Sequence, residues 1–108
     1  MLFTLILKDN KDFLRLYKKG KFIAGKYAVI YYTKSRNDYN RMGITAGKKI
    51  GKAVERNRAK RLIRQAYREN ESILPRGYDY VIVAREAING VKCGAVTDFM
   101  KYAAKKIK

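Results

Sequence analysis

One stretch of this chain, from Gly47 to Arg68, limits what the sequence can fold into more than any other. It reads GKKIGKAVERNRAKRLIRQAYR and holds nine basic side chains but a single acidic one, Glu55. From Ala53 onward it contains neither Gly nor Pro and is rich in good helix formers, which predicts a helix to about Asn70. The chain must therefore fold around a helix that carries one sign of charge.

The predicted helix has two unlike faces. At about 100° per residue, its apolar side chains gather on one stripe, which we expect to be buried. The stripe consists of Ala59, Leu62, Ile63, Ala66 and Tyr67. The opposite face and its two flanks carry Arg56, Asn57, Arg58, Lys60, Arg61, Arg64 and Arg68. Because like charges four residues apart repel one another, this face needs an anionic partner from outside the chain.

The overall charge indicates what that partner is. The chain has a formal net charge of +17 over 108 residues, which favours a polyanion over simple solvation of the helix face. Between Glu55 and Arg68 arginine outnumbers lysine five to one, and the planar guanidinium suits phosphates and base edges. We therefore expect nucleic acid as the partner. A solvated charged face and a basic surface facing anionic lipid are the alternatives.

The composition predicts one folded domain and excludes several kinds of site. The chain is 47% apolar and has nine Tyr and four Phe, more than a disordered basic tail would hold. Its only cysteine, Cys93, excludes an internal disulfide and indicates a reducing compartment, for which the cytoplasm fits. The apolar run in MLFTLILKDN is too short for a signal peptide or a membrane span. Since there is no histidine, we expect no Ser-His, Cys-His or zinc mechanism.

The rest of the chain predicts a mixture of helices and strands. Lys8–Lys19 is typical of a helix that Asp9 or Asn10 caps and Gly20 ends, after an extended or irregular Leu2–Ile6. The predicted strands are Lys21–Ala24, Tyr27–Lys34, Arg41–Ala46 and Tyr78–Arg85. The last predicted helix is Ala95–Lys106, with a buried side made of Phe99, Tyr102, Ala103 and Ile107.

Turn chemistry and alternation predict how the strands pair. The polar segment Ser35–Asn40 favours an antiparallel hairpin between Tyr27–Lys34 and Arg41–Ala46. The basic helix between Arg41–Ala46 and Tyr78–Arg85 predicts a parallel βαβ unit. The continuous run Val81–Val83 indicates a central strand. Alternation places Tyr27, Val29 and Tyr31 on one strand face and Ala28, Ile30 and Tyr32 on the other.

Residues Ala53–Arg68, AVERNRAKRLIRQAYR, resemble the Arg-Asn-Arg signature helix of the bacterial ribonuclease P protein subunit. Three further segments resemble the family's first helix, the strand and loop before the signature, and its last strand. They are LKDNKDFLRLYKKGK (Leu7–Lys21), RMGITAGKKIGKAV (Arg41–Val54) and YDYVIVAR (Tyr78–Arg85). The resemblance implies a single α+β domain over residues 1–108, in the order α-β-β-β-α-β-α. It also implies a mixed four-stranded sheet and a left-handed βαβ crossover.

The resemblance further implies an RNA-binding protein that assists the catalytic ribonuclease P RNA in removing 5′ leaders from precursor tRNA. That RNA carries out the hydrolysis and binds most of the Mg²⁺, so no catalytic or metal-binding residue is expected here. The implied residues for binding the RNA subunit are Lys48, Lys49, Lys52, Arg56, Asn57, Arg58, Lys60, Arg61, Arg64 and Arg68. The implied leader-binding cleft consists of Phe13, Tyr17, Val29 and Tyr31, whose rings suit stacking by unpaired bases.

Some alternatives stay open from the sequence. Phe13 and Tyr17 lie four residues apart on a helix, and core packing explains that spacing as simply as a leader contact does. A non-enzymatic ribosomal or RNA-assembly protein has a similar composition. A DNA-binding protein is disfavoured because the apolar stripe commits the basic helix to the core. The apolar amino end also departs from the more basic segment typical of the family, so a contact made there in relatives is not carried over.

Overall fold

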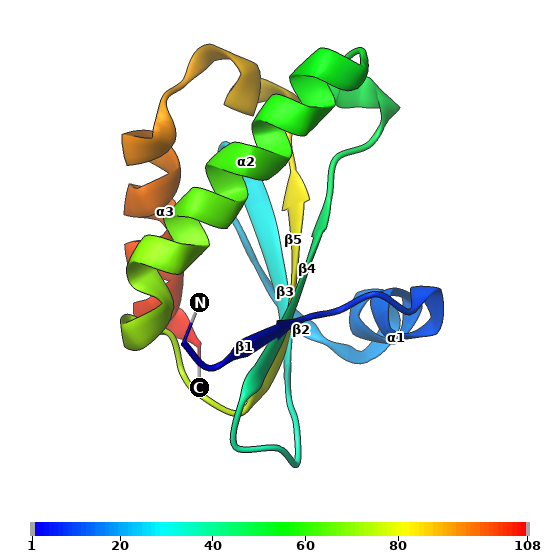
Figure 1. Cartoon of the computed structure of the whole chain (residues 1–108), viewed down its shortest axis with the longest axis vertical. Coiled ribbons are helices and arrows are strands. Elements are labelled where there is room, and N and C mark those ends of the chain that lie inside the picture. Colours follow the sequence, from blue (N-terminus) through cyan, green and yellow to red (C-terminus); the bar gives the residue numbers. More distant parts are fainter. Residues whose placement is uncertain (1, 108) are drawn as a thin grey trace.

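A computed structural model describes residues 2–107 of the chain. These residues form a five-stranded mixed sheet with α1 on one face and α2 and α3 on the other (Figure 1). The strands are β1 (Thr4–Ile6), β2 (Lys21–Ala24), β3 (Ala28–Lys34), β4 (Asn40–Thr45) and β5 (Tyr78–Ala84). The helices are α1 (Asn10–Lys19), α2 (Ala53–Asn70) and α3 (Cys93–Lys106), with short 3₁₀ turns η1 (Lys48–Ile50), η2 (Glu71–Ile73) and η3 (Glu86–Gly90).

Strand β5 lies at the centre of the sheet, whose order is β1-β4-β5-β3-β2. It pairs in parallel with β4 and antiparallel with β3, and six of its seven residues are buried. This position explains the apolar run Val81–Val83, because a strand that is covered on both faces does not need to alternate polar and apolar side chains. The predicted central strand and the parallel β4-α2-β5 unit are confirmed. The left hand of that crossover stays a prediction.

Two predictions about the sheet are wrong. Strands β3 and β4 do not form a hairpin, because β5 is inserted between them. The segment that joins them instead crosses the start of β5, where Ser35 N–H donates to the Gly77 carbonyl and Gly77 N–H donates to Asn40 Oδ1. The implied count of four strands is also wrong, because the amino end, predicted as extended or irregular, contains strand β1, which pairs in parallel with β4 and makes the count five.

Helix positions agree with the sequence pattern except near their ends. Helix α2 spans Ala53–Asn70 as predicted, whereas α1 begins two residues later and α3 two residues earlier than predicted. Tyr102, predicted on the buried side of α3, is 52% exposed. The buried stripe of α3 is centred on Val96, Phe99, Met100 and Ala103, which leaves Tyr102 at its margin. No helix within residues 2–107 has the length and apolar character of a membrane span.

The core has two unequal parts, one on each face of the sheet. The larger part lies between the sheet and helices α2 and α3. Its largest buried side chains include Ile30, Met42, Ile63, Tyr67, Tyr80 and Ile82. The smaller part, made of Leu7, Leu16 and Val81, lies beneath α1. Alternation is confirmed within β3, since Ala28, Ile30 and Tyr32 are buried in the larger part while Val29 and Tyr31 face the α1 side half-buried. The prediction is wrong for Tyr27, which precedes β3 and packs against the larger part.

Glu71 fixes strand β1 beside the end of α2. Its carboxylate accepts hydrogen bonds from the backbone N–H of Leu2 at 2.7 Å, from that of Phe3 at 3.2 Å and from the Thr4 hydroxyl. The Thr4 hydroxyl is also 2.8 Å from that of Tyr67 on α2. Burial alone would raise the pKa of Glu71, but these hydrogen bonds outweigh it and lower the pKa below its usual value. The position of β1 therefore depends on a buried carboxylate.

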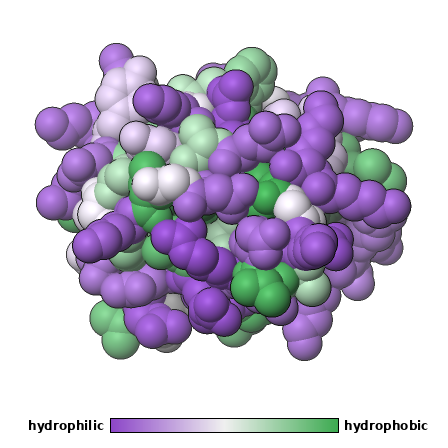
Figure 2. Space-filling model, turned by 90° about the horizontal axis from the view of Figure 1, so that it is seen from above, coloured by the Kyte–Doolittle hydropathy of each residue, from purple (hydrophilic) through white to green (hydrophobic). Residues whose placement is uncertain are grey.

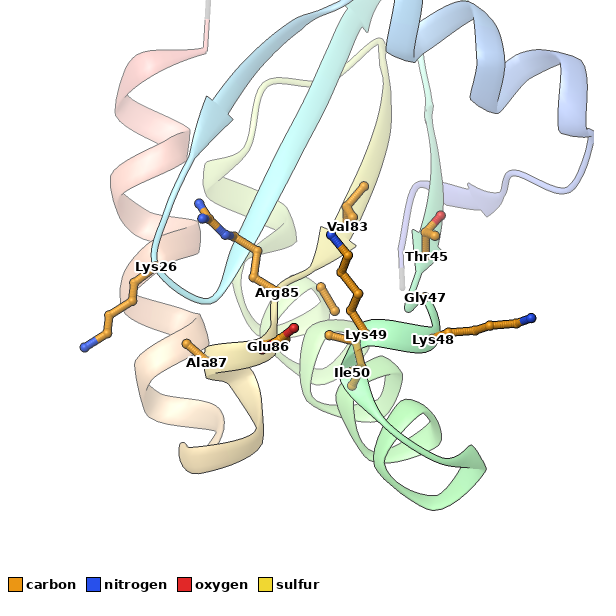
Figure 3. A pocket seen from close by; sticks show the side chains of 11 residues that line it. Lys26, Thr45, Gly47, Lys48, Lys49, Ile50, Val83, Arg85, Glu86 and Ala87 are labelled. Carbon is orange, nitrogen blue, oxygen red and sulfur yellow. The ribbon is translucent and has the colours of Figure 1, made fainter.

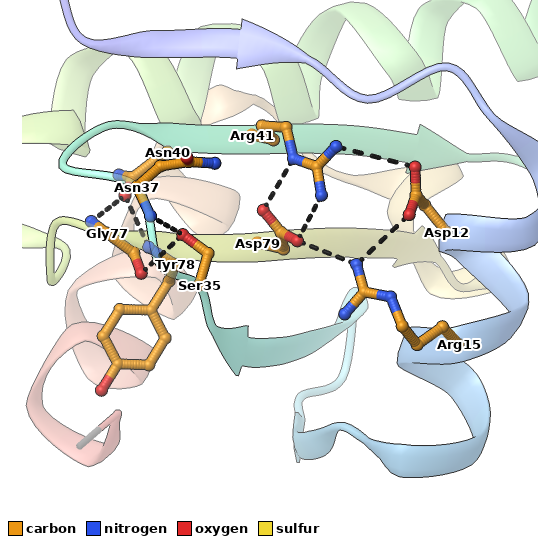
Figure 4. A network of polar contacts seen from close by, with 9 residues as sticks. All are labelled: Asp12, Arg15, Ser35, Asn37, Asn40, Arg41, Gly77, Tyr78 and Asp79. Atoms are coloured by element: carbon orange, nitrogen blue, oxygen red, sulfur yellow. Dashed lines mark hydrogen bonds and ion pairs between the residues drawn. The ribbon is translucent and has the colours of Figure 1, made fainter.

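Asp79 on β5 ties α1 and β4 to the centre of the sheet (Figure 4). Its carboxylate is 2% exposed and accepts from Arg41 Nη2 at 2.8 Å, Arg41 Nε at 3.0 Å and Arg15 Nη2 at 2.9 Å. Asp12 completes the network, 3.3 Å from Arg15 and 3.7 Å from Arg41. Burial would raise the pKa of Asp79, but the hydrogen bonds from both arginines lower it overall.

The lowered pKa of Asp79 predicts how stability depends on pH. A carboxylate with a lower pKa in the folded than in the unfolded chain stabilises the fold fully above about pH 4, and this stabilisation disappears as the pH falls through the folded value. We expect Asp79→Asn to lower the free energy of unfolding at neutral pH by about 2 to 4 kcal/mol, since its arginine partners are only partly buried. The difference from the wild type should shrink in acid.

Urea unfolding of both proteins from neutral pH into the acid range measures this difference. Asp98→Asn is the matched control, because Asp98 is exposed and forms no ion pair among residues 2–107. A difference between Asp79→Asn and the wild type that stays constant down to the lowest pH would contradict the role given to this carboxylate.

Candidate nucleic-acid interface

The basic side chains of α2 and of the loop before it are free of carboxylate partners. Within residues 2–107, every ion pair joins Arg15 or Arg41 to Asp12 or Asp79. The exposed members of the predicted set are Lys48, Lys49, Lys52, Asn57, Arg61 and Arg68, and the half-buried ones are Arg56, Arg58, Lys60 and Arg64. Seen from the end where α2 begins, the molecule is hydrophilic over most of its surface (Figure 2). Such a surface attracts a polyanion.

Two arginines of α2 differ from the others. Arg58 donates from Nη1 to the Ile88 carbonyl at 3.3 Å and from Nη2 to the Val91 carbonyl at 2.6 Å. It therefore holds η3 and the segment before α3 against α2, and only its remaining donors are available to an anion. Nε of Arg56 is the one buried side-chain nitrogen or oxygen in the described part of the chain without a hydrogen-bond partner. An unpaired buried donor costs free energy that a bound anion would recover.

A second surface lies on the opposite face of the sheet, beside α1. The rings of Tyr17 on α1 and Tyr31 on β3 meet edge to face, with centroids 5.0 Å apart. The Tyr17 hydroxyl is 3.0 Å from Thr45 Oγ1 on β4, so α1 is anchored across the sheet. Val29 lies on the same face of β3 as Tyr31. The structure thus brings together three of the four residues predicted to line a cleft, with Tyr17 still 37% exposed.

Phe13, the fourth predicted cleft residue, lies against β4 instead of β3. A Cβ at Gly43 would come within 2.4 Å of the tip of the Phe13 ring, so only glycine permits this approach. The half-buried ring also packs on the small core cluster of Leu7, Leu16 and Val81. Core packing therefore explains why one side of the Phe13 ring is buried, while the ring as a whole remains partly exposed.

The sequence analysis missed one aromatic residue of this surface. Phe22 on β2 pairs in register with Tyr31, and the two ring centroids are 5.7 Å apart. Phe22 is 61% exposed, which is unusual for a large apolar ring on a folded protein. The strand Lys21–Ala24 was predicted, but its register against β3 was not. That register was the missing signal, because it decides which residue of β2 lies beside Tyr31.

An open pocket of about 720 Å³ continues this surface past the ends of β4 and β5. Thr45 and Val83 line the pocket and also border the aromatic surface, since Thr45 contacts Tyr17 and Val83 pairs with Val29. Its cationic lining consists of Lys26, Lys48, Lys49 and Arg85, against a single acid, Glu86. In Figure 3, Lys49 reaches toward Val83 at the end of β5, Arg85 extends toward β2 and β3, and Lys26 and Lys48 point outward from opposite sides. Arg85 Nη1 donates to the Gly25 carbonyl at 3.0 Å. An anionic strand leaving the aromatic rings would meet these charges next.

The different roles of Arg58 and Arg61 lead to a prediction about stability. Arg58→Ala removes two charge-assisted hydrogen bonds to backbone carbonyls, and we expect it to lower the free energy of unfolding by about 1.5 to 3 kcal/mol. Arg61→Ala is the matched control, because Arg61 is exposed and surface substitutions usually change stability by less than about 0.5 kcal/mol. Thermal or urea unfolding measures both. Equal stability of the two variants would contradict the structural role of Arg58.

Comparisons with known proteins show which family this chain belongs to. The family model described as Ribonuclease P matches residues 3–108. The ribonuclease P protein component of Clostridioides difficile (strain 630) is 54% identical over 81 residues, covering 73% of this chain and 70% of the relative. That of Clostridium acetobutylicum is 43% identical over 97 residues, covering 88% of this chain and 82% of the relative.

Two solved structures are similar over almost their whole length. The RNase P protein from Thermotoga maritima matches with a TM-score of 0.85 and 33% identity, covering 94% of this chain and 96% of that one. The RNase P protein of Staphylococcus aureus matches with a TM-score of 0.81 and 32% identity, covering 93% and 92%. This chain therefore belongs to the ribonuclease P protein family.

Proposed function

We propose that this chain is the protein subunit of ribonuclease P, an endoribonuclease, and that it acts in tRNA processing by helping a catalytic RNA remove 5′ leaders from precursor tRNA. Family membership supports this function. The structural observation that carries it is the presence of two RNA-compatible surfaces, the charged side of α2 and the aromatic rings of Tyr17, Tyr31 and Phe22, which lie on opposite sides of the sheet and have Lys48 and Lys49 of the loop before α2 in common. A protein that binds two RNAs at once needs such a separation.

The two surfaces suit different kinds of RNA. The unpaired cations of α2 and its preceding loop suit the phosphates of a large folded RNA, so we assign them to the ribonuclease P RNA. Tyr17, Tyr31 and Phe22 suit unpaired bases, which stack on aromatic faces with little regard to sequence. The basic pocket beside them suits the backbone of the same single strand. We therefore assign the cleft to the 5′ leader, which varies between precursors.

The protein's part in this proposal is to bind and to position. Mg²⁺ supplies the charge stabilisation and activated water of phosphodiester hydrolysis, and we assign its binding mainly to the RNA. The side chains of residues 2–107 do not fit a metal site, because no three potential His, Cys, Asp or Glu ligands gather and Asp12 and Asp79 are paired with arginines. We also propose the cytoplasm as its compartment, where Cys93, which is free, would stay reduced.

The leader-binding role predicts a selective loss of affinity. Tyr17→Ala and Tyr31→Ala should each weaken binding of a precursor tRNA with a leader of several nucleotides by about 1 to 3 kcal/mol, the usual worth of one stacked base. Affinity for mature tRNA, which has no leader, should not change. Tyr17→Phe is the matched control, because it keeps the ring and removes only the hydroxyl that contacts Thr45.

Binding measurements on the holoenzyme with both tRNAs, together with melting temperatures, separate this role from core packing. A buried aromatic residue cut to Ala would lower the free energy of unfolding by about 3 to 5 kcal/mol and harm both ligands alike. Equal losses of affinity for precursor and mature tRNA would show that the two tyrosines have only a structural role.

A further inference from the structure

The loop before α2 is the part of the chain that the two surfaces have in common. Its lysines, Lys48 and Lys49, lie in η1, line the basic pocket and precede the charged side of α2. The loop begins at Gly47 and ends at Gly51, and glycine gives a backbone more conformational freedom than any other residue. Gly51 has a φ of +137°, which other residues rarely adopt. The two lysines are therefore held in one position only if contacts beyond this backbone restrain the loop.

Two restraints on this loop, Gly47–Gly51, act from the core and from its junction with α2. The side chain of Ile50 is buried in the larger core. After the loop, the Glu55 carboxylate accepts from the backbone N–H of Lys52 at 3.3 Å. Neither contact holds the carbonyl of Ile50, which belongs to the peptide group just before the positive φ of Gly51. Rotation at this point would turn the loop relative to α2.

Asn89 supplies a restraint at this carbonyl. Its Nδ2 donates to the Ile50 carbonyl at 2.6 Å, across 39 positions of the sequence. It lies in η3, which packs against η1 (Figure 3) and is itself fixed on α2 by the bonds from Arg58 to Ile88 and Val91. The Asn89 side chain is exposed, so core packing does not explain it. The amide acts through this hydrogen bond, which is the one side-chain bond that Asn89 forms within residues 2–107.

We propose that Asn89 is a positioning residue, which orders the loop before RNA binds and so holds Lys48 and Lys49 where both RNAs can reach them. The inference rests on the proposed function, because it assumes that these lysines contact RNA. A loop that is already in its bound conformation binds more tightly, since the cost of ordering it is met during folding. Without the Asn89 bond, the first RNA to bind would carry this cost, whereas the second would meet an ordered loop.

Binding of the two RNAs in turn tests this role. Asn89→Leu removes the amide donor and keeps a side chain of similar size, while Gly90→Ala is the matched control, because a Cβ at this next residue of η3 meets nothing within 4 Å. With a bacterial ribonuclease P RNA as the probe, Asn89→Leu should bind about 2- to 12-fold more weakly, the worth of one hydrogen bond. A precursor tRNA should then bind to the assembled holoenzyme of this variant as it does to that of the wild type. Gly90→Ala should match the wild type in both steps.

A double-mutant cycle shows whether Asn89 acts through the two lysines. In a protein with Lys48→Ala and Lys49→Ala, the position of the loop no longer matters for binding. Adding Asn89→Leu to that protein should therefore cause no further loss of affinity for the same RNA. A general effect on folding would instead lower the affinity by the same factor with and without the lysines.

Amide hydrogen exchange of the free protein is an independent measurement that needs no RNA. The backbone N–H of Ile50 and that of Gly51 each donate to a carbonyl within the loop. Their exchange should be about 2- to 12-fold faster in Asn89→Leu than in the wild type, because the loop opens more often. In Gly90→Ala their exchange should keep the wild-type rate.

Wild-type affinity and wild-type exchange rates in Asn89→Leu would overturn the positioning role and leave the proposed function intact. Equal losses in both binding steps, or an undiminished loss in the protein without the two lysines, would also overturn it, since either result shows a general effect on folding. If the wild type itself does not bind the RNA, the proposed function falls and the positioning role falls with it.

Discussion

The pairing of strand β5 on both edges is the constraint on which the rest of this structure depends. Val81 lies opposite Tyr31 on β3 and opposite Gly43 on β4, so one strand fixes the register of both neighbours. Along its α1 side, Asp79 binds the arginines of α1 and β4, Val81 packs beneath α1, and Val83 reaches the basic pocket. Along its other side, Tyr80 and Ile82 are buried in the larger core with α2. Both surfaces that we propose to bind RNA are therefore positioned by the same seven residues.

This arrangement explains how a small protein can present the two surfaces that we propose for RNA. Helix α2 uses its apolar stripe to cover one face of the sheet, and its charged side then points away from the cleft. Helix α1 covers only part of the opposite face, because the Asp79 network holds it over one end of the central strands. The uncovered end leaves the rings of Tyr31 and Phe22 accessible beside the cations of the basic pocket. The charged side of α2 and the aromatic rings therefore lie on opposite faces of the sheet.

Much of this fold follows from local pattern, and what does not follow depends on partners distant in sequence. The span of α2 and the two faces of β3 were predicted because helical and strand periods are local properties. The hairpin between β3 and β4 was wrong because a turn sequence shows that the chain reverses, but not that β5 enters between the two strands. The pairing of β1 with β4 was missed because a three-residue strand is too short to show an alternation of polar and apolar side chains.

In the candidate site too, features set by local pattern were predicted, and features set by contacts between distant segments were not. The exposure of the basic face of α2 was predicted from its spacing, and the roles of that face and of Tyr17 and Tyr31 in RNA binding stay predictions. The inward role of Arg58 was not predicted, because its carbonyl partners at Ile88 and Val91 lie 30 and 33 residues away. The exposed ring of Phe22 was missed for a similar reason, since its neighbour is set by the register of β2 against β3. Pairings between distant segments, which no local pattern encodes, account for these differences.

The measurement that tests the central claim most directly is cleavage of a precursor tRNA by a bacterial ribonuclease P RNA at a Mg²⁺ concentration too low for the RNA alone. Added protein should restore removal of the 5′ leader, because its cations replace part of the charge neutralisation that high Mg²⁺ otherwise provides. At saturating Mg²⁺ the RNA should cleave without the protein. Failure of the folded protein to restore cleavage at low Mg²⁺, or cleavage by the protein without RNA, would contradict the account.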